Sequence, residues 1–143
     1  MRARLLAARC SPVELRAALT SVPPGDRDAW LDVLLGIGTL PDDGPALPRA
    51  CVPYAPCAVD ALLRLVELAD VRASDVFVDI GSGLGRATTL VHLLTGATTI
   101  GLEVQPELVR AARALASDLG LERCTVLEGD AVQLVETLTV LLA

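Results

Sequence analysis

The feature of this sequence that most constrains its fold is a short apolar segment that runs directly into a glycine-rich turn. Residues 76–80 read Val-Phe-Val-Asp-Ile, and residues 81–86 read Gly-Ser-Gly-Leu-Gly-Arg. An apolar run of this kind is typical of a parallel strand covered on both faces, and glycines at alternate positions allow the backbone to turn sharply. The pattern predicts a strand, a glycine loop and a helix, which together commonly form a site for a nucleotide-like ligand.

Two side chains in this segment bear on the kind of ligand. An acid near the end of an apolar strand is costly to bury without a polar partner, so we expect Asp79 to lie at the carboxyl end of the strand and face a ligand. A dinucleotide-binding fingerprint requires a small residue three positions after its second glycine, and Arg86 stands at that position. Gly81, Gly83 and Gly85 instead follow a Gly-x-Gly-x-Gly pattern, which disfavours a dinucleotide.

Two later apolar segments also end in acids. Residues 98–104 include Glu103, and residues 125–131 include Asp130. An acid such as Glu103 can accept hydrogen bonds from vicinal ribose hydroxyls, but nicotinamide enzymes place an acid at a similar spacing. Taken singly, Asp79 can be a turn-capping acid, Glu103 a solvated charge at a strand end, and Asp130 the N-cap of the segment after it.

Together, the three segments resemble the motifs of the class I methyltransferases that use S-adenosylmethionine. The resemblance covers residues 76–131 and implies that Asp79 attracts the cofactor ammonium, Glu103 binds the ribose and Asp130 lies beside the adenine amino group. It identifies no catalytic residue. For Ser82 and Arg86 the alternatives are a loop hydroxyl and an exposed cation at a helix start. Together with Tyr54, which precedes the glycine loop, the implied cofactor-binding residues are Asp79, Gly81, Ser82, Gly83, Gly85, Glu103, Val104, Asp130 and Ala131.

A shorter resemblance precedes the glycine loop. Residues 52–54 read Val-Pro-Tyr ahead of a helix expected at residues 57–69, and several protein-lysine methyltransferases carry a similar segment before their first motif. The resemblance implies that Tyr54 lies over the cofactor and helps to line the acceptor channel, with a protein lysine as the acceptor. The alternative is a proline-stiffened connector with Tyr54 packed against the sheet.

The chain divides into a helical extension at residues 1–50 and a cofactor-binding domain at residues 51–143. Residues 11–14 read Ser-Pro-Val-Glu, which combines an N-cap, a first-turn proline and a capping-box glutamate, and so predicts a helix start. A second helix is expected after Asp26, and residues 36–53 are expected to form an irregular loop. We expect Trp30 to be a buried anchor, with a substrate platform as the alternative.

Alternation of strands and helices predicts an α/β fold: a Rossmann-like parallel sheet in a three-layer α/β/α arrangement. A complete class I methyltransferase has seven strands, whereas this chain has three, with a candidate fourth at residues 138–142. An incomplete sheet leaves an apolar edge uncovered. We therefore expect either a fragment or a protein that self-associates through this edge.

Composition narrows the partners and the compartment. A hydrophobic content of 52% with 21% charged residues predicts a packed globular protein. The net charge is −6, and the chain has a single Trp, a single Tyr and a single Phe. Both features disfavour a nucleic-acid partner, which needs basic residues and aromatic rings for base stacking. The apolar residues 5–8 are too few for a signal peptide, so a cytoplasmic protein without a membrane span is expected. The cysteines show no metal-ligand spacing and His92 is the lone histidine, so the sequence predicts no metal site. We expect the cysteines to be free thiols, with a Cys51–Cys57 disulfide as the alternative. We expect His92 to be a boundary residue.

Two hypotheses follow from the sequence. The first is an S-adenosylmethionine-dependent methyltransferase, or the cofactor-binding half of one, whose methyl acceptor includes protein lysine as a candidate. The second is a non-catalytic Rossmann-like module that binds a nucleoside cofactor or serves in association.

Overall fold

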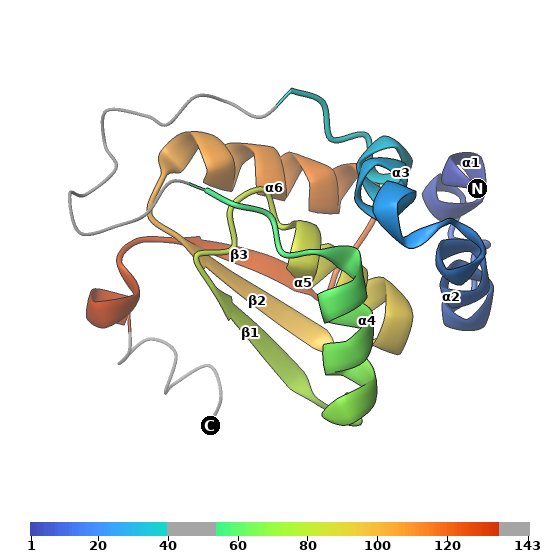
Figure 1. Ribbon diagram of the computed structural model, residues 1–143. Helices are drawn as coiled ribbons and strands as arrows, with labels where there is room; N and C mark the ends of the chain where they lie inside the picture. The colour runs from blue at the N-terminus through green and yellow to red at the C-terminus, as the bar shows by residue number, and fades with distance from the viewer. Residues whose placement is uncertain (40–53, 135–143) are drawn as a thin grey trace.

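The computed structural model describes residues 1–39 and 54–134. Strands β1 (Val76–Ile80), β2 (Thr98–Glu103) and β3 (Cys124–Glu128) form one parallel sheet in the order β1-β2-β3 (Figure 1). The predicted Rossmann-like α/β class and its incomplete sheet are confirmed. The candidate fourth strand at residues 138–142 lies outside the described residues.

The two crossover helices cover the same face of this sheet. Helix α5 (Arg86–Thr95) connects β1 to β2, and α6 (Pro106–Asp118) connects β2 to β3. Right-handed crossovers that step in one direction place their helices on one face. Leu90 of α5 and Leu115 of α6 belong to the same buried cluster, which is consistent with neighbouring helices on that face. The described residues thus form two layers of the expected three-layer arrangement.

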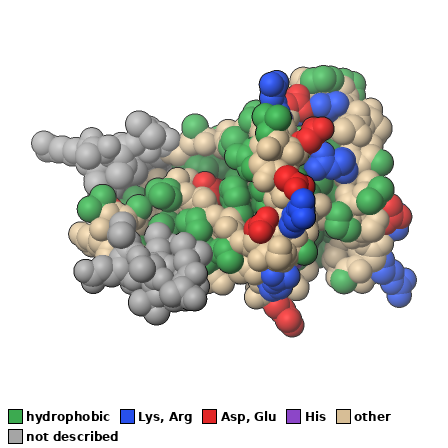
Figure 2. All heavy atoms as spheres, turned by 90° about the horizontal axis from the view of Figure 1, so that it is seen from below, with side chains coloured by type: hydrophobic (Ala, Val, Ile, Leu, Met, Phe, Trp, Pro, Cys, Tyr) green, Lys and Arg blue, Asp and Glu red, His purple; other side chains and the backbone are tan. Residues whose placement is uncertain are grey.

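The opposite face of the sheet is partly uncovered at β1. Val76 and Ile80, at the two ends of the strand, are 45% and 68% exposed. The expectation that this strand is covered on both faces is therefore wrong for β1, whereas Ile100 and Leu102 of the central strand β2 are buried. Viewed from below, the surface shows charged side chains in a band across its middle and at one side, with hydrophobic side chains on both sides of this band (Figure 2).

The two edges of the sheet differ in how their backbone groups are satisfied. At the outer side of β3, the guanidinium of Arg113 donates two hydrogen bonds to the carbonyl oxygen of Val126, at 3.0 and 2.9 Å. At β1, Gly81 N–H donates to the Leu102 carbonyl on the β2 side. Because the backbone N–H and C=O groups of successive strand residues point to alternate sides, those of Val78 point away from β2. No described strand pairs with this outer edge of β1.

In the described part of the chain, five helical segments precede β1. They are α1 (Arg2–Leu6), α2 (Pro12–Ser21), the 3-10 turn η1 (Pro24–Asp26), α3 (Arg27–Leu35) and α4 (Val59–Leu68). The capping box predicted at Ser11 and Glu14 is confirmed, because the Ser11 hydroxyl accepts from Glu14 N–H while the Glu14 carboxylate accepts from Ser11 N–H. Helix α1 was not predicted; it is short, and its N-cap makes no side-chain hydrogen bond.

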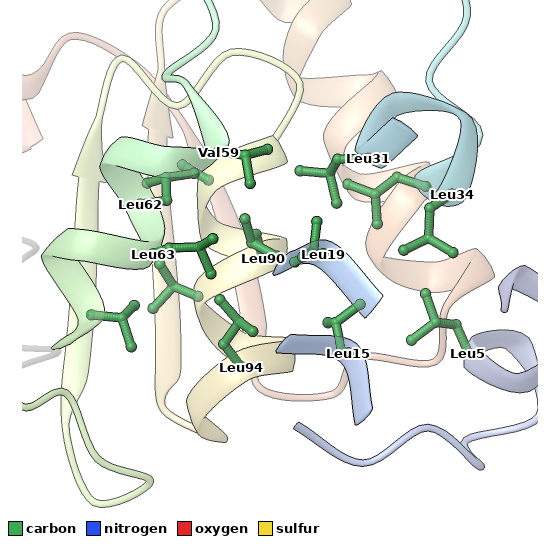
Figure 3. Packing of buried hydrophobic residues seen from close by; sticks show 14 of the residues in the cluster. Leu5, Leu15, Leu19, Leu31, Leu34, Val59, Leu62, Leu63, Leu90 and Leu94 are labelled. Atoms are coloured by element: carbon green, nitrogen blue, oxygen red, sulfur yellow. The ribbon is translucent and has the colours of Figure 1, made fainter. Parts of the chain in front are cut away.

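The helical extension shares its core with the sheet helices. Leucines of α1, α2 and α3 pack in one cluster with side chains of α4 and α5, and Figure 3 shows Leu15 and Leu19 beside Leu90 and Leu94. Trp30 packs against this cluster, as predicted for an anchor, but it is half-buried and not buried as expected. The extension therefore has a fixed position relative to the helix that follows the glycine loop.

The lone histidine is a boundary residue, as predicted. His92 is half-buried, and its Nδ1 lies 2.7 Å from the carbonyl oxygen of Ala97.

Within residues 1–39 and 54–134, no helix has the length and apolar character needed to cross a membrane.

Candidate cofactor site

The three glycines of the loop between β1 and α5 all adopt left-handed backbone conformations, with φ of 79° at Gly81, 53° at Gly83 and 73° at Gly85. Side-chain-bearing residues rarely adopt such angles. Their surroundings differ. A Cβ at Gly81 would meet nothing within 4 Å, one at Gly83 would clash with the ring of Tyr54, and one at Gly85 would lie 3.1 Å from the Cβ of Ala112. Gly81 therefore faces open space, whereas Gly85 is required for packing against α6.

Glu103 binds the glycine loop directly. Its side chain is only 5% exposed; Oε2 accepts a hydrogen bond from Gly83 N–H at 2.8 Å, and Oε1 accepts one from Gln105 N–H at 2.8 Å. The alternative of a solvated strand-end charge is therefore wrong. A carboxylate has about four acceptor positions, so each oxygen can still accept a further hydrogen bond from a ligand hydroxyl.

Asp79 lies beside Glu103 on the face of the sheet covered by α5. In the register it pairs with Gly101, two residues before Glu103, and residues two apart point to the same face. Burial raises the pKa of the Asp79 carboxyl, and the negative charge of Glu103 raises it further. No ion pair in the described residues includes Asp79 or Glu103. The side of the sheet where the strands reach their carboxyl ends thus holds two neighbouring acids that have no cationic partner among the described residues.

Asp130 follows β3 at the same edge. Gly129 N–H donates to the carbonyl oxygen of Glu103 at 2.9 Å, which fixes the end of β3 beside the end of β2. The Asp130 carboxylate accepts from Val132 N–H at 2.8 Å, so the alternative that it caps the following segment is confirmed. This bond occupies one of the carboxylate's acceptor positions and leaves others for a ligand.

Val104 and Ala131 are the remaining predicted residues at this edge. Val104 directly follows β2, Ala131 follows Asp130, and both are half-buried. The parallel order of β1, β2 and β3 brings all these strand ends to one edge, so the predicted set of strand-end residues is assembled together.

Ser82 points into the protein. It is 3% exposed, and a Cβ on Gly101 would lie 2.5 Å from its Oγ, so the hydroxyl packs over β2. Among the described residues its Oγ has no hydrogen-bond partner. Ser82 N–H donates to the carbonyl oxygen of Leu102 at 2.9 Å. Because the Ser82 side chain occupies the space where a Cβ of residue 101 would lie, residue 101 must be a glycine.

Arg86 is buried, so the alternative of an exposed helix-start cation is wrong. The residue is 3% exposed; its Nε lies 2.7 Å from Asp32 Oδ1, its Nη2 lies 2.7 Å from Asp28 Oδ1, and its Nη1 donates to the Cys57 carbonyl at 2.5 Å. Asp28 also accepts a hydrogen bond from Val59 N–H at 2.9 Å, at the start of α4. One guanidinium therefore connects α3, the segment before α4 and the start of α5.

Tyr54 lies against the glycine loop, where its ring occupies the space beside Gly83. It is half-buried. Burial raises the pKa of the Tyr54 hydroxyl; the charge of Arg86 opposes this, while Asp32 and Asp79 add to it. The aromatic residue that sequence resemblance indicated is thus placed beside the loop. Residues 52 and 53 of the same segment lie outside the described residues.

No group of three His, Cys, Asp or Glu residues in the described ranges is arranged to hold a metal ion. Cys10, Cys57 and Cys124 are free thiols. The alternative disulfide between Cys51 and Cys57 involves a residue outside the described part of the chain.

Comparison with known proteins agrees with this geometry. Residues 72–140 match the family model for a methyltransferase domain. An RNA methyltransferase from Salinibacter ruber, solved in complex with S-adenosyl-L-homocysteine, matches with a TM-score of 0.51 and 36% sequence identity over 53% of this chain and 50% of that chain. An S-adenosylmethionine-dependent methyltransferase from Thiobacillus denitrificans, also solved with S-adenosyl-L-homocysteine, matches in fold with a TM-score of 0.50 and 22% identity over 59% of this chain and 38% of that chain.

Residues 72–140 therefore match a methyltransferase-domain family in sequence, and the parallel sheet of the described residues has the Rossmann-like fold of the class I enzymes. The chain spans about half the length of the Salinibacter enzyme that it matches. No curated protein sequence matches the chain.

Replacing Glu103 by Ala is expected to lower the free energy of unfolding by about 1–3 kcal/mol, because two buried N–H groups lose a charged acceptor. The matched control is Glu128→Ala, since Glu128 pairs with Glu103 in the register but is exposed, and its loss is expected to change stability by less than about 0.5 kcal/mol. Urea denaturation followed by circular dichroism measures both. Equal effects of the two substitutions would contradict the bridging role of Glu103.

Proposed function

We propose that this chain is the cofactor-binding half of an S-adenosylmethionine-dependent methyltransferase. The observation that carries the proposal is the pair of acids, Asp79 and Glu103, which lies beside the open backbone of Gly81 and has no cationic partner among the described residues. S-Adenosylmethionine carries a sulfonium and an ammonium, so it supplies the compensating positive charge. A nicotinamide dinucleotide would instead bring a negatively charged pyrophosphate toward the same acids.

The proposed cofactor contacts follow from the positions of the strand ends. Asp79 attracts the ammonium, the backbone of the glycine loop lies against the methionine part, and Glu103 accepts hydrogen bonds from the ribose hydroxyls. Asp130 lies beside the adenine. The amides at the start of α5 are the proposed site for the carboxylate. The full proposed set is Tyr54, Asp79, Gly81, Ser82, Gly83, Gly85, Glu103, Val104, Asp130 and Ala131.

The residues of this site are suited to positioning a methyl donor. Methyl transfer from a sulfonium is an in-line displacement in which the acceptor attacks the methyl carbon while the carbon–sulfur bond breaks. A lysine acceptor attacks only as the neutral amine, so its ammonium proton must first pass to solvent; the protein then contributes mainly by holding donor and acceptor in line, and S-adenosylhomocysteine is the leaving group. We assign no catalytic acid or base to this chain.

Protein lysine is the proposed acceptor, supported by the position of Tyr54 beside the glycine loop and by the resemblance of its segment to that of protein-lysine methyltransferases. The net charge of −6 also disfavours a polyanionic substrate. RNA is the second candidate, because the Salinibacter protein of 36% identity is an RNA methyltransferase.

We also propose a cytoplasmic location and self-association through the outer edge of β1. The support for self-association is that no described strand pairs with this edge and that Ile80 is exposed beside it.

The chain is expected to bind S-adenosylmethionine and S-adenosylhomocysteine, and to bind NAD weakly or not at all. Asp79→Asn should weaken S-adenosylmethionine binding by about 10- to 100-fold, because an ionic hydrogen bond contributes roughly 1.5–3 kcal/mol. Glu122→Gln is the control, since it removes the same charge from an exposed residue near the opposite end of the sheet. Isothermal titration calorimetry measures all these affinities. A preference for NAD would reject the methyltransferase proposal.

Binding of S-adenosylmethionine is expected to weaken as the pH is lowered toward the raised pKa of Asp79, because burial and Glu103 favour the protonated carboxyl in the free protein. The cationic ligand favours the carboxylate, so binding must release a proton in this range. Calorimetry in buffers of different ionisation enthalpy counts the protons released. Asp79→Asn should show no such release, and an unchanged pH dependence in that variant would contradict the assignment.

The chemical identity of the methyl acceptor is tested by incubating the chain with radioactively methyl-labelled S-adenosylmethionine and a cell extract. Parallel samples are then digested with protease or with ribonuclease. Label that is sensitive to protease and resistant to ribonuclease is expected, with methyl-lysine recovered after hydrolysis. Ribonuclease-sensitive label would favour RNA. Cofactor binding without any transfer by the chain would favour a non-catalytic cofactor-binding module.

A further inference from the structure

A buried arginine that the proposed cofactor contacts do not use lies directly behind the glycine loop. Arg86 is the first residue of α5, immediately after Gly85, and its guanidinium contacts Asp28 and Asp32 of α3 and the backbone carbonyl of Cys57. Its three nitrogens are therefore all engaged in a residue that is 3% exposed. An arginine fork can hold several acceptors in fixed directions, whereas the ammonium of lysine is a single point charge.

The contacts of this arginine fix the chain on the carboxyl side of Tyr54. Cys57 is bound through its carbonyl to Arg86, and Val59 is bound through its N–H to Asp28, which itself pairs with Arg86. Two successive anchors thus hold the residues that lead from Tyr54 into α4. At the other end of this short segment, the ring of Tyr54 lies against Gly83.

We propose that Arg86 is a positioning residue that holds the Tyr54 segment against the glycine loop, and that its pairing with Asp28 and Asp32 makes cofactor affinity depend on α3 of the helical extension. The part that concerns affinity rests on the proposed function. The part that concerns Tyr54 does not depend on any ligand.

An arginine of α3 itself provides a matched control. Arg27 also links α3 to α4, because its Nη1 lies 2.5 Å from Asp60 Oδ1, and its side chain is 16% exposed. Its other described contacts are to the carbonyls of Val22 and Thr20, away from the glycine loop. Arg27→Gln therefore weakens the attachment of α3 to α4 without touching the Tyr54 segment.

Tyr54 is the single tyrosine of the chain, so its ultraviolet titration reports one phenol. In the wild type, burial raises the pKa of Tyr54 and the nearby charge of Arg86 lowers it, with Asp32 and Asp79 acting in the raising direction. In Arg86→Gln, a released ring would titrate closer to the ordinary pKa of an exposed phenol, about 10. A ring that stays in place would titrate at higher pH, because only the positive charge is lost.

The experiment compares the 143-residue wild type with Arg86→Gln, Arg86→Lys and Arg27→Gln. Titration at 295 nm, with circular dichroism to confirm folding at each pH, should show a lowered Tyr54 pKa in Arg86→Gln and a wild-type value in Arg27→Gln. Calorimetry with S-adenosylhomocysteine should show at least about tenfold weaker binding in Arg86→Gln, a smaller loss in Arg86→Lys and little change in Arg27→Gln.

An increase of the Tyr54 pKa in folded Arg86→Gln would overturn the proposal, as would equal losses of affinity in the Arg86 and Arg27 variants. If Arg86→Gln proves too unstable to measure, Asp32→Asn keeps the arginine but removes one of its partners, and it should weaken S-adenosylhomocysteine binding more than Arg27→Gln does; only this affinity is used for that variant, because loss of the Asp32 charge by itself lowers the Tyr54 pKa. A wild type that binds no S-adenosylhomocysteine would reject the proposed function, and the tyrosine titration would still decide whether Arg86 holds the ring.

Discussion

The candidate site depends on one buried carboxylate, that of Glu103. It stands at the end of the central strand and accepts hydrogen bonds from Gly83 in the glycine loop and from Gln105 at the start of the next connection. A buried acid is costly unless its acceptor positions are filled, and here two backbone N–H groups fill part of them. The remaining positions and the neighbouring acid, Asp79, leave an excess of negative charge at this edge. The local need for positive charge is what links the fold to a cationic cofactor.

Sequence patterns located the sheet because the signals for it are local. The apolar runs, the alternating glycines and the prolines at helix starts lie within the elements that they specify, and all three strands were predicted within a few residues. The ligand edge followed from these positions, since parallel strands end on one side of a sheet. The same local reasoning missed α1, which has no side-chain cap and only five residues.

The burial of Arg86 could not be predicted from local patterns. Its partners Asp28 and Asp32 are 58 and 54 residues away in sequence, so nothing near Arg86 indicates an ion pair. A charged residue at the start of a helix is ordinarily solvated, and only the packing of the helical extension against α5 makes it a buried contact. The exposure of Ile80 has a similar cause, because whether a strand is covered depends on its neighbours in the sheet and not on its own composition.

The most direct test of a cationic cofactor at this edge is a titration of the ¹⁵N-labelled chain with S-adenosylmethionine, followed by two-dimensional NMR of its amides. The account predicts that the amide signals of Gly81, Gly83 and Gly129 shift on binding while those of α2 stay in place. Shifts confined to other surfaces, or an unchanged spectrum from a folded chain at saturating ligand, would contradict it.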